Sequence, residues 1–427
     1  MTCLGRDACV ATVLVLLAFL TGCGGSSSSS GSSSGGGSSG GGSSGGSTVA
    51  NTQAVQVNTG PSNYYGPNGL FTSVTICVPG TSTCQNISNV LVDTGSYGLR
   101  LVSSLVTVTL PQSTGTSGNV VQECIMYADG SYTWGPVATA DIQMAMAGEK
   151  ASAVPIQLIS ASLTPAPPSS CTSGGGPNNG TVQALGANGI IGIGPFRQDC
   201  GAACAGSSPP AQYYVCPSSG CTVAAVGVAS QLQNPVWMFP QDNNGVLISL
   251  PSVPAAGAIS VSASMFFGIG TQSNNALGSA QLYQADGCGN LSTTFNGTTY
   301  SDTTTSCAGG TFFDTGSSGL YILDATALGI AKCPPNLAPF YCPTSTTNFM
   351  ATNTGTNGTS AQVTFSVANA NTLFSSGNAA FNNLAGAGAG STLGFDWGLP
   401  FFFGRNVFVG IEGQNSPTGV AGPYWAF

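Results

Sequence analysis

Two copies of the tetrapeptide Asp-Thr-Gly-Ser, at residues 93–96 and 314–317, are the part of this sequence best suited to catalysis. Each copy directly follows a short apolar run, which predicts a buried strand that ends at the aspartate. A carboxylate held on a tight glycine turn at the end of a buried strand is typical of a catalytic group. Two such carboxyl groups brought face to face cannot both ionise, so they share one proton and act together as acid and base. Asp93 and Asp314 are therefore the candidate catalytic residues.

The spacing and composition indicate which elements must position these aspartates. The two motifs lie about 220 residues apart, which predicts one motif in each of two lobes. In a chain that is 42% apolar, 62 glycines accompany abundant Ser, Thr and Asn, a composition that favours strands and turns. We therefore expect an all-β fold with a cleft between two β-rich lobes, residues 51–252 and residues 253–427. Within the first lobe, Asp129-Gly130 predicts a hairpin turn and residues 188–194 an apolar strand broken by glycines, while residues 223–232 are the best helix candidate.

The charged residues exclude several classes of function. Only 5% of the residues are charged, the formal net charge is −8, and no cluster of Lys or Arg is present, which argues against nucleic-acid binding. The chain has no histidine, which excludes Ser-His-Asp and Cys-His catalysis and any histidine-ligated metal. Carboxyl groups are the obvious acid–base groups that remain, so we expect neither a metal nor a cofactor.

The N-terminus has the features of an export signal. Residues 10–20 form an apolar segment of signal-peptide length, which is short for a membrane span. The segment ends in Leu-Thr-Gly-Cys23, which resembles the lipobox of bacterial lipoproteins. That resemblance implies a signal peptide at residues 1–22 and lipidation of Cys23; an ordinary secretory signal is the alternative. Residues 24–47 are almost entirely Gly and Ser, so residues 23–50 would form a flexible tether from the membrane.

The cysteines predict a disulfide-bonded domain. Without Cys3, Cys9 and Cys23, 12 cysteines remain, an even number in an exported domain. The pairs that we expect are Cys77–Cys84, Cys288–Cys307, Cys333–Cys342 and Cys124–Cys171. The remaining cysteines have a loose zinc-site spacing, but without histidine we expect disulfides there as well: Cys200, Cys204, Cys216 and Cys221.

Over residues 65–425, the ordered set of motifs resembles the pepsin-like aspartic peptidases, specifically their bacterial lipoprotein branch described by a domain of unknown function. In that family each lobe carries an apolar-apolar-Asp-Thr-Gly-Ser/Thr loop, matched by residues 91–96 and 312–317. Each lobe also carries a later apolar-apolar-Gly element that crosses this loop, matched by residues 190–192 and less cleanly by residues 402–404. A flap hairpin with a tyrosine is matched by residues 127–131, although Ala128 stands where glycine is common.

The resemblance implies roles for the residues beside the two aspartates. In each motif the serine would donate a hydrogen bond to the outer carboxylate oxygen, the glycine would let backbone amides approach, and the threonine would bond across the lobe interface. These dyad-supporting residues are Thr94, Gly95, Ser96, Thr315, Gly316 and Ser317. Tyr127, with Gly130 and Ser131 in the hairpin turn, would close over an extended substrate and exclude water.

The sequence thus predicts a monomeric aspartic endopeptidase that hydrolyses a polypeptide substrate and is lipid-anchored in a bacterial cell envelope. Because Gly24 is not the aspartate associated with inner-membrane retention, we expect the outer membrane if the cell is Gram-negative. The alternative is a catalytically inactive lipoprotein of the same fold that binds peptide or glycan, and the presence of both aspartates favours the enzyme. A structural envelope protein, the third class, would have no ordered cleft.

Overall fold

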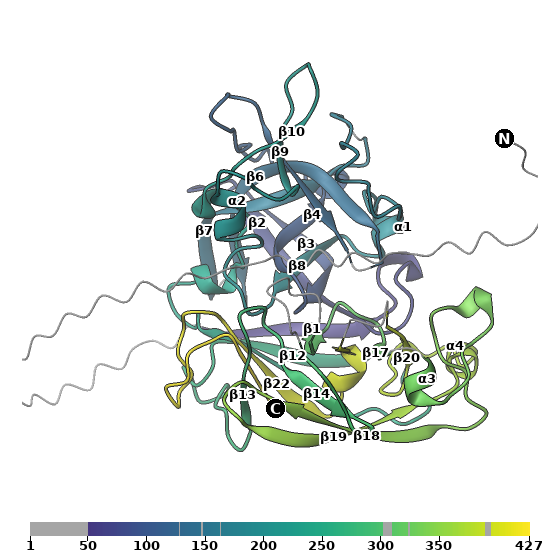
Figure 1. The fold of residues 1–427 in the computed structure, drawn as a ribbon. Coiled ribbons are helices and arrows are strands. Elements are labelled where there is room, and N and C mark those ends of the chain that lie inside the picture. Colours follow the sequence, from purple (N-terminus) through teal and green to yellow (C-terminus); the bar gives the residue numbers. More distant parts are fainter. Residues whose placement is uncertain are drawn as a thin grey trace, which may run out of the picture.

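The computed structural model describes residues 50–427, except residues 128, 147, 163, 302–309, 323–324 and 389–393. The signal segment, Cys23, the tether and Cys307 therefore lie outside the described residues. Figure 1 shows two β-rich lobes, the upper one coloured purple to teal and the lower one green to yellow. The prediction of an all-β fold is confirmed, because the longest α-helix in the described part of the chain is α4, with five residues.

The first half of the chain forms most of the upper lobe (Figure 1). Its strands are β1 (Thr52–Asn58), β2 (Gly69–Cys77), β3 (Cys84–Asp93), β4 (Tyr97–Val102), β5 (Val121–Met126), β6 (Tyr132–Met144), β7 (Glu149–Ile159), β8 (Gly189–Ile193), β9 (Tyr213–Val215), β10 (Thr222–Val223) and β11 (Gly245–Leu250). Its helices are α1 (Val182–Leu185) and α2 (Ala202–Ala205), with short 3-10 turns at η1 (Pro61–Asn63), η2 (Ser103–Leu105), η3 (Val228–Ser230) and η4 (Val236–Met238).

The second half forms most of the lower lobe. Its strands are β12 (Val261–Phe267), β13 (Leu282–Gln284), β14 (Ser292–Phe295), β15 (Thr298–Tyr300), β16 (Phe312–Asp314), β17 (Leu320–Ile322), β18 (Thr347–Thr354), β19 (Ser360–Val367), β20 (Ala385–Ala387), β21 (Phe395–Gly398), β22 (Arg405–Gly410) and β23 (Tyr424–Ala426). Its helices are α3 (Ala325–Leu328) and α4 (Ala370–Phe374), with 3-10 turns at η5 (Pro335–Leu337) and η6 (Leu399–Phe402).

One continuous sheet joins the two lobes. At their junction β1 pairs with β2 on one side and with β12 on the other, and β11 lies between β12 and β22. The strands alternate apolar and polar residues where one face is buried; Val55 and Val57 of β1 point into the core while their neighbours do not. The main hydrophobic cluster also includes Val246 of β11 and Val409 of β22, so the lobes share one core.

Five disulfides lie in the described part of the chain. The predicted pairs Cys77–Cys84, Cys124–Cys171 and Cys333–Cys342 are confirmed. The cysteines with loose zinc-site spacing form two further short loops, Cys200–Cys204 and Cys216–Cys221. Each of these bonds closes a loop of at most 47 residues inside one lobe. It therefore lowers the conformational entropy of the unfolded chain within that loop.

The prediction of a helix over residues 223–232 is wrong. Thr222 and Val223 pair with β9 as strand β10, and only η3 is helical within this segment. Backbone amides in the segment bond to distant carbonyls instead of to the preceding turn; the Val226 amide, for example, donates to Cys204 O. The Gln231 side chain donates to Val226 O and so also competes with helical bonding.

A buried acid makes the stability of this fold depend on pH. Glu149 at the start of β7 is 1% exposed, and burial together with the neighbouring Asp242 raises its pKa to about 8. In the unfolded chain a glutamate titrates near about 4.3. The native state therefore holds a proton that the unfolded chain releases, so this contribution to stability is fully present below about pH 4.3 and is lost as the pH rises to about 8.

We expect the urea midpoint of the wild type to fall between pH 4 and pH 8 by more than that of Glu149→Gln. The glutamine variant removes the titrating group and keeps a side chain of similar shape. Equal pH dependence of the two midpoints would contradict a protonated Glu149 in the native state.

Candidate active site

Each Asp-Thr-Gly-Ser motif lies at the end of a short strand that is paired in parallel with a second strand from the same lobe. β3 ends at Asp93 and runs parallel to β8, with Asp93 opposite Gly192. β16 ends at Asp314 and runs parallel to β21, with Asp314 opposite Gly398. Asp93 and Asp314, at the ends of these strands, both line the cavity between the lobes.

The same two hydrogen bonds orient each of the two carboxyl groups. The Gly95 amide donates to Asp93 Oδ1 at 2.8 Å, and Ser96 Oγ donates to Asp93 Oδ2 at 2.5 Å. In the second lobe the corresponding donors to Asp314 are the Gly316 amide at 2.7 Å and Ser317 Oγ at 2.7 Å. The serine and glycine of each motif thus hold its carboxyl group in one orientation.

The two carboxyl groups face each other across the lobe boundary, each packed against the glycine of the opposite motif. A Cβ atom on Gly95 would lie 2.8 Å from the carboxyl carbon of Asp314, and one on Gly316 would lie 2.9 Å from that of Asp93. Both distances are too short for any side chain, so these positions require glycine. Burial raises the pKa of Asp314 well above its ordinary value, and the facing Asp93 raises it further. The raised pKa of Asp314 indicates that the two carboxyl groups hold one proton between them.

The threonines bond across the lobe boundary. Thr94 Oγ1 donates to Phe313 O at 2.6 Å and accepts from the Thr315 amide at 3.0 Å. Thr315 Oγ1 donates to Val92 O at 2.7 Å and accepts from the Thr94 amide at 3.1 Å. Both side chains are buried, so these reciprocal bonds fix the two turns relative to each other.

The predicted hairpin is formed by β5 and β6; Tyr127 lines the interlobe cavity, whereas Gly130 in the turn lies against Gly174 and Gly176. Gly130 has φ of +81°, which the tight turn requires, and its amide donates to Tyr127 O at 2.9 Å. Ser131 Oγ donates to Asp129 Oδ1 at 2.6 Å, which makes Asp129 a turn residue. Tyr127 lines the same cavity as the two aspartates, and burial raises its pKa to about 12, so its hydroxyl stays protonated.

A cavity of about 170 Å³ lies between the lobes and is lined by both. Asp93, Tyr127 and Phe196 contribute from the first half of the chain. Asp314 and Asp396 contribute from the second. Within the described ranges, no three Cys, Asp or Glu side chains are arranged to hold a metal ion.

The sequence prediction for the strand that crosses the second turn is wrong. Residues 402–404 do not pair with β16; they lie at the end of η6 and beyond it. The strand in that place is β21, whose Asp396 pairs with Phe312 and whose Gly398 pairs with Asp314. The apolar-apolar-Gly pattern missed β21 because an acid, Asp396, stands at the first of the three positions.

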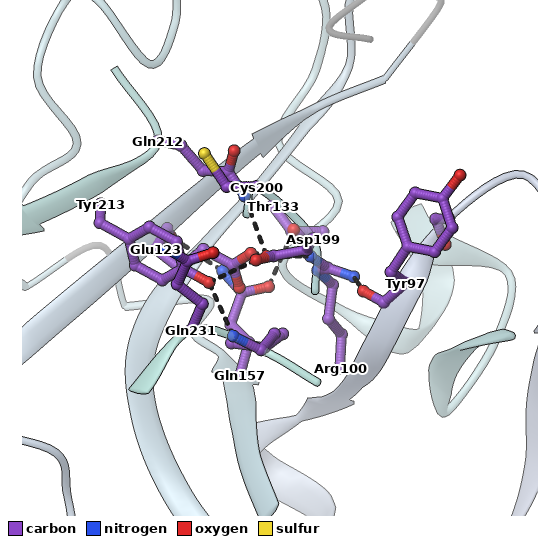
Figure 2. A network of polar contacts seen from close by, with 12 residues as sticks. Tyr97, Arg100, Glu123, Thr133, Gln157, Asp199, Cys200, Gln212, Tyr213 and Gln231 are labelled. Atoms are coloured by element: carbon purple, nitrogen blue, oxygen red, sulfur yellow. Dashed lines mark hydrogen bonds and ion pairs between the residues drawn. The ribbon is translucent and has the colours of Figure 1, made fainter. Parts of the chain in front are cut away.

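Figure 2 shows a second acidic cluster that the sequence did not reveal, built around Arg100. Arg100 Nη2 lies 2.7 Å from Glu123 Oε1 and 3.1 Å from Asp199 Oδ2, and all three side chains are at most 1% exposed. Arg100 Nη1 also donates to Tyr97 O, next to the Asp93 turn. Since Glu123 lies on the hairpin strand β5, the cluster connects the Asp93 turn to the hairpin.

The Arg100 cluster contains one cation and two acids, so it favours an additional proton. Tyr213 OH and Gln212 Nε2 both donate to Asp199, at 2.7 Å and 2.9 Å. Burial nevertheless raises the pKa of Asp199 well above its ordinary value, and the adjacent Glu123 adds to this shift. The three charged members, Arg100, Glu123 and Asp199, come from different parts of the chain, which is why no sequence motif indicated the cluster.

Comparison with known proteins gives a family without an assigned activity. The family described as "Protein of unknown function (DUF3443)" matches residues 47–427. No curated protein matches the chain. Since the match covers both lobes and both Asp-Thr-Gly-Ser turns, the chain belongs to the family described as "Protein of unknown function (DUF3443)".

Proposed function

We propose that this protein is an aspartic endopeptidase in which Asp93 and Asp314 activate a water molecule for attack on a peptide bond. The observation that carries the proposal is the pair of facing, identically hydrogen-bonded carboxyl groups in an interlobe cavity. The resemblance of the motifs to pepsin-like aspartic peptidases supports it as well.

In this proposal the two acids perform different proton transfers. Asp314, whose pKa is raised, supplies a proton to the carbonyl oxygen of the scissile bond. Asp93 accepts a proton from the water as the water attacks the carbonyl carbon, which gives a tetrahedral diol. The C–N bond then breaks as Asp93 passes this proton to the leaving nitrogen and Asp314 takes a proton back from a hydroxyl of the diol, which leaves a carboxylic acid and an amine. Tyr127 lies over the cavity at the hairpin tip, where it covers an extended substrate and reduces access of bulk water.

The proposal is tested by digestion of a mixture of denatured proteins from acid to neutral pH. We expect endoproteolytic cleavage with an optimum below pH 7, because loss of the shared proton leaves two carboxylates and no acid for the carbonyl oxygen. Peptides with a tetrahedral hydroxyl at the scissile position should inhibit, whereas chelators should not. Specific peptide binding without cleavage at any pH would favour the inactive binding protein instead.

We propose that the protein acts as a monomer, since one chain supplies both aspartates, and that Cys23 anchors it in a bacterial envelope. No helix in the described part of the chain has the length and hydropathy to span a bilayer. The envelope assignment is supported by the resemblance of residues 20–23 to a lipobox and by the Gly/Ser segment that follows.

Replacement of Cys23 by Ser should release the protein from the membrane fraction. Serine lacks the thiol that receives the diacylglyceryl group, so the variant should also lose the corresponding mass at its mature N-terminus. Fractionation followed by mass spectrometry measures both effects, and Cys9→Ser is the matched control, which should remain membrane-bound. An unmodified N-terminus in the wild type would contradict the anchor.

A further inference from the structure

A third carboxyl group lies directly behind the proposed dyad. Ser317 Oγ is 2.7 Å from Asp314 Oδ2 and 2.6 Å from Asp396 Oδ2, so one hydroxyl bridges two acids. A serine hydroxyl carries one hydrogen and can donate only one of these two bonds. The other bond therefore needs a hydrogen on a carboxyl group, either Asp314 or Asp396.

The surroundings of Asp396 favour its neutral form. Asp396 Oδ1 is buried and has no hydrogen-bond partner among the described residues. The titratable groups that interact with Asp396 from neighbouring elements are all acids or phenols: Asp93 on β3, Asp314 on β16, Tyr65 before β2 and Tyr321 on β17. An ionised Asp396 would thus have a bare, buried oxygen and no cation among these neighbours, which is costly.

The two possible donors have different consequences. If Asp314 donated outward to Ser317, its proton would point away from Asp93 and from the space where water must bind. If Asp396 donates to Ser317, the serine hydrogen is left for Asp314 Oδ2, and the Asp314 proton stays on the side that faces Asp93. The second arrangement agrees with burial raising the pKa of Asp396 to about 8.

We propose that Asp396 is a positioning residue that stays protonated during catalysis and donates to Ser317, so that Ser317 in turn donates to the outer oxygen of Asp314. The inference rests on the proposed aspartic peptidase function, because it assigns Asp396 a task in that dyad. Ionisation of Asp396 would draw the Ser317 hydrogen away from Asp314 and place a second negative charge beside the dyad. Loss of activity at alkaline pH then reflects two ionisations, that of the dyad and that of Asp396.

The test compares Asp396→Asn with Asp396→Val. The asparagine amide can donate to Ser317 and never ionises, so it imitates the protonated acid. We expect Asp396→Asn to keep kcat within about 3-fold at acid pH, and Asp396→Val to lose about 10- to 100-fold in kcat with little change in KM. Above the pH optimum, log kcat of the wild type should fall by more than one per pH unit. In Asp396→Asn it should fall by only one per pH unit, because one of the two ionising groups is gone. Equal losses in both variants, or an unchanged alkaline slope in Asp396→Asn, would overturn the proposal.

A second measurement does not depend on catalysis. In protein labelled with ¹³C at the aspartate carboxyl carbons, we expect one resonance that remains in the protonated form at pH 6, titrates near pH 8, and is missing from Asp396→Asn but present in Asp93→Asn. An Asp396 resonance that is already ionised at pH 6 would refute the inference even in an active enzyme. An inactive wild type with this resonance in place would reject the peptidase proposal and leave the protonated Asp396 standing.

Discussion

Asp93→Asn and Asp314→Asn should each reduce peptide hydrolysis by about 10⁴-fold or to below detection. In the proposed mechanism each carboxyl group performs one of the two proton transfers, and an amide can neither accept the proton of water nor supply one to the carbonyl oxygen. The fold should remain, because the amide keeps the shape, its oxygen can accept from the glycine amide, and its NH2 group can donate to the serine hydroxyl.

Initial rates on a fluorogenic peptide, with circular dichroism to confirm folding, measure this effect. Asp141→Asn is the matched control: Asp141 lies on β6 away from the cavity and accepts from the backbone amides of Gly80 and Ala153. It should keep wild-type turnover. Near-normal rates in either dyad variant would mean that the pair does not carry the reaction.

Arg100→Met should cost about 3–5 kcal/mol of unfolding free energy, the largest stability loss that we expect from a single substitution in this chain. The change removes the cation between Glu123 and Asp199, which are both fully buried. Two adjacent acids would then be left without their positive partner, and a buried polar or charged group without its partner is destabilising.

The unfolding free energy lost in Arg100→Met should be smaller at acid pH than at neutral pH. Burial already raises the pKa of Asp199, and removal of Arg100 takes away the neighbouring cation that opposes this rise, so the folded variant should lose more stability as the pH rises. Urea denaturation at pH 4.5 and pH 7 measures the difference. Lys150→Met, which removes an exposed cation from β7, is the control and should change stability little. An Arg100→Met protein as stable as this control at pH 7 would show that the cluster does not support the fold.

The elements that the sequence predicted well are those with a local signal. The strands before Asp93 and Asp314, the strand β8 and the hairpin at Gly130 are each marked by an apolar run or a turn residue within a few positions. Cys77–Cys84 and Cys333–Cys342 could be paired by closeness for the same reason, whereas Cys124–Cys171 was the pair that remained.

The features that the sequence did not predict depend on partners far along the chain. Asp396 meets Ser317 across 79 residues, and Arg100 meets Asp199 across 99, so no spacing rule connects them. The segment around Phe402 was predicted to be the crossing strand because it fits the apolar-apolar-Gly pattern. In the structure its apolar residues are buried in the core, within and just after η6. The helix expected at residues 223–232 was displaced by bonds to α2 and β9, which local propensity cannot anticipate.

The pairing of β1 with β12 determines how early during synthesis the central sheet of this protein can form. The Asn51 side chain bonds to Phe267 O, 216 residues later, and Thr94 bonds to Phe313 O, 219 residues later. At a synthesis rate of about 5–20 residues per second, β1 waits roughly 10–40 s for its partner strand to emerge from the ribosome. Asp93 must likewise wait for Asp314, so a nascent or truncated chain carries half a dyad and no working pair.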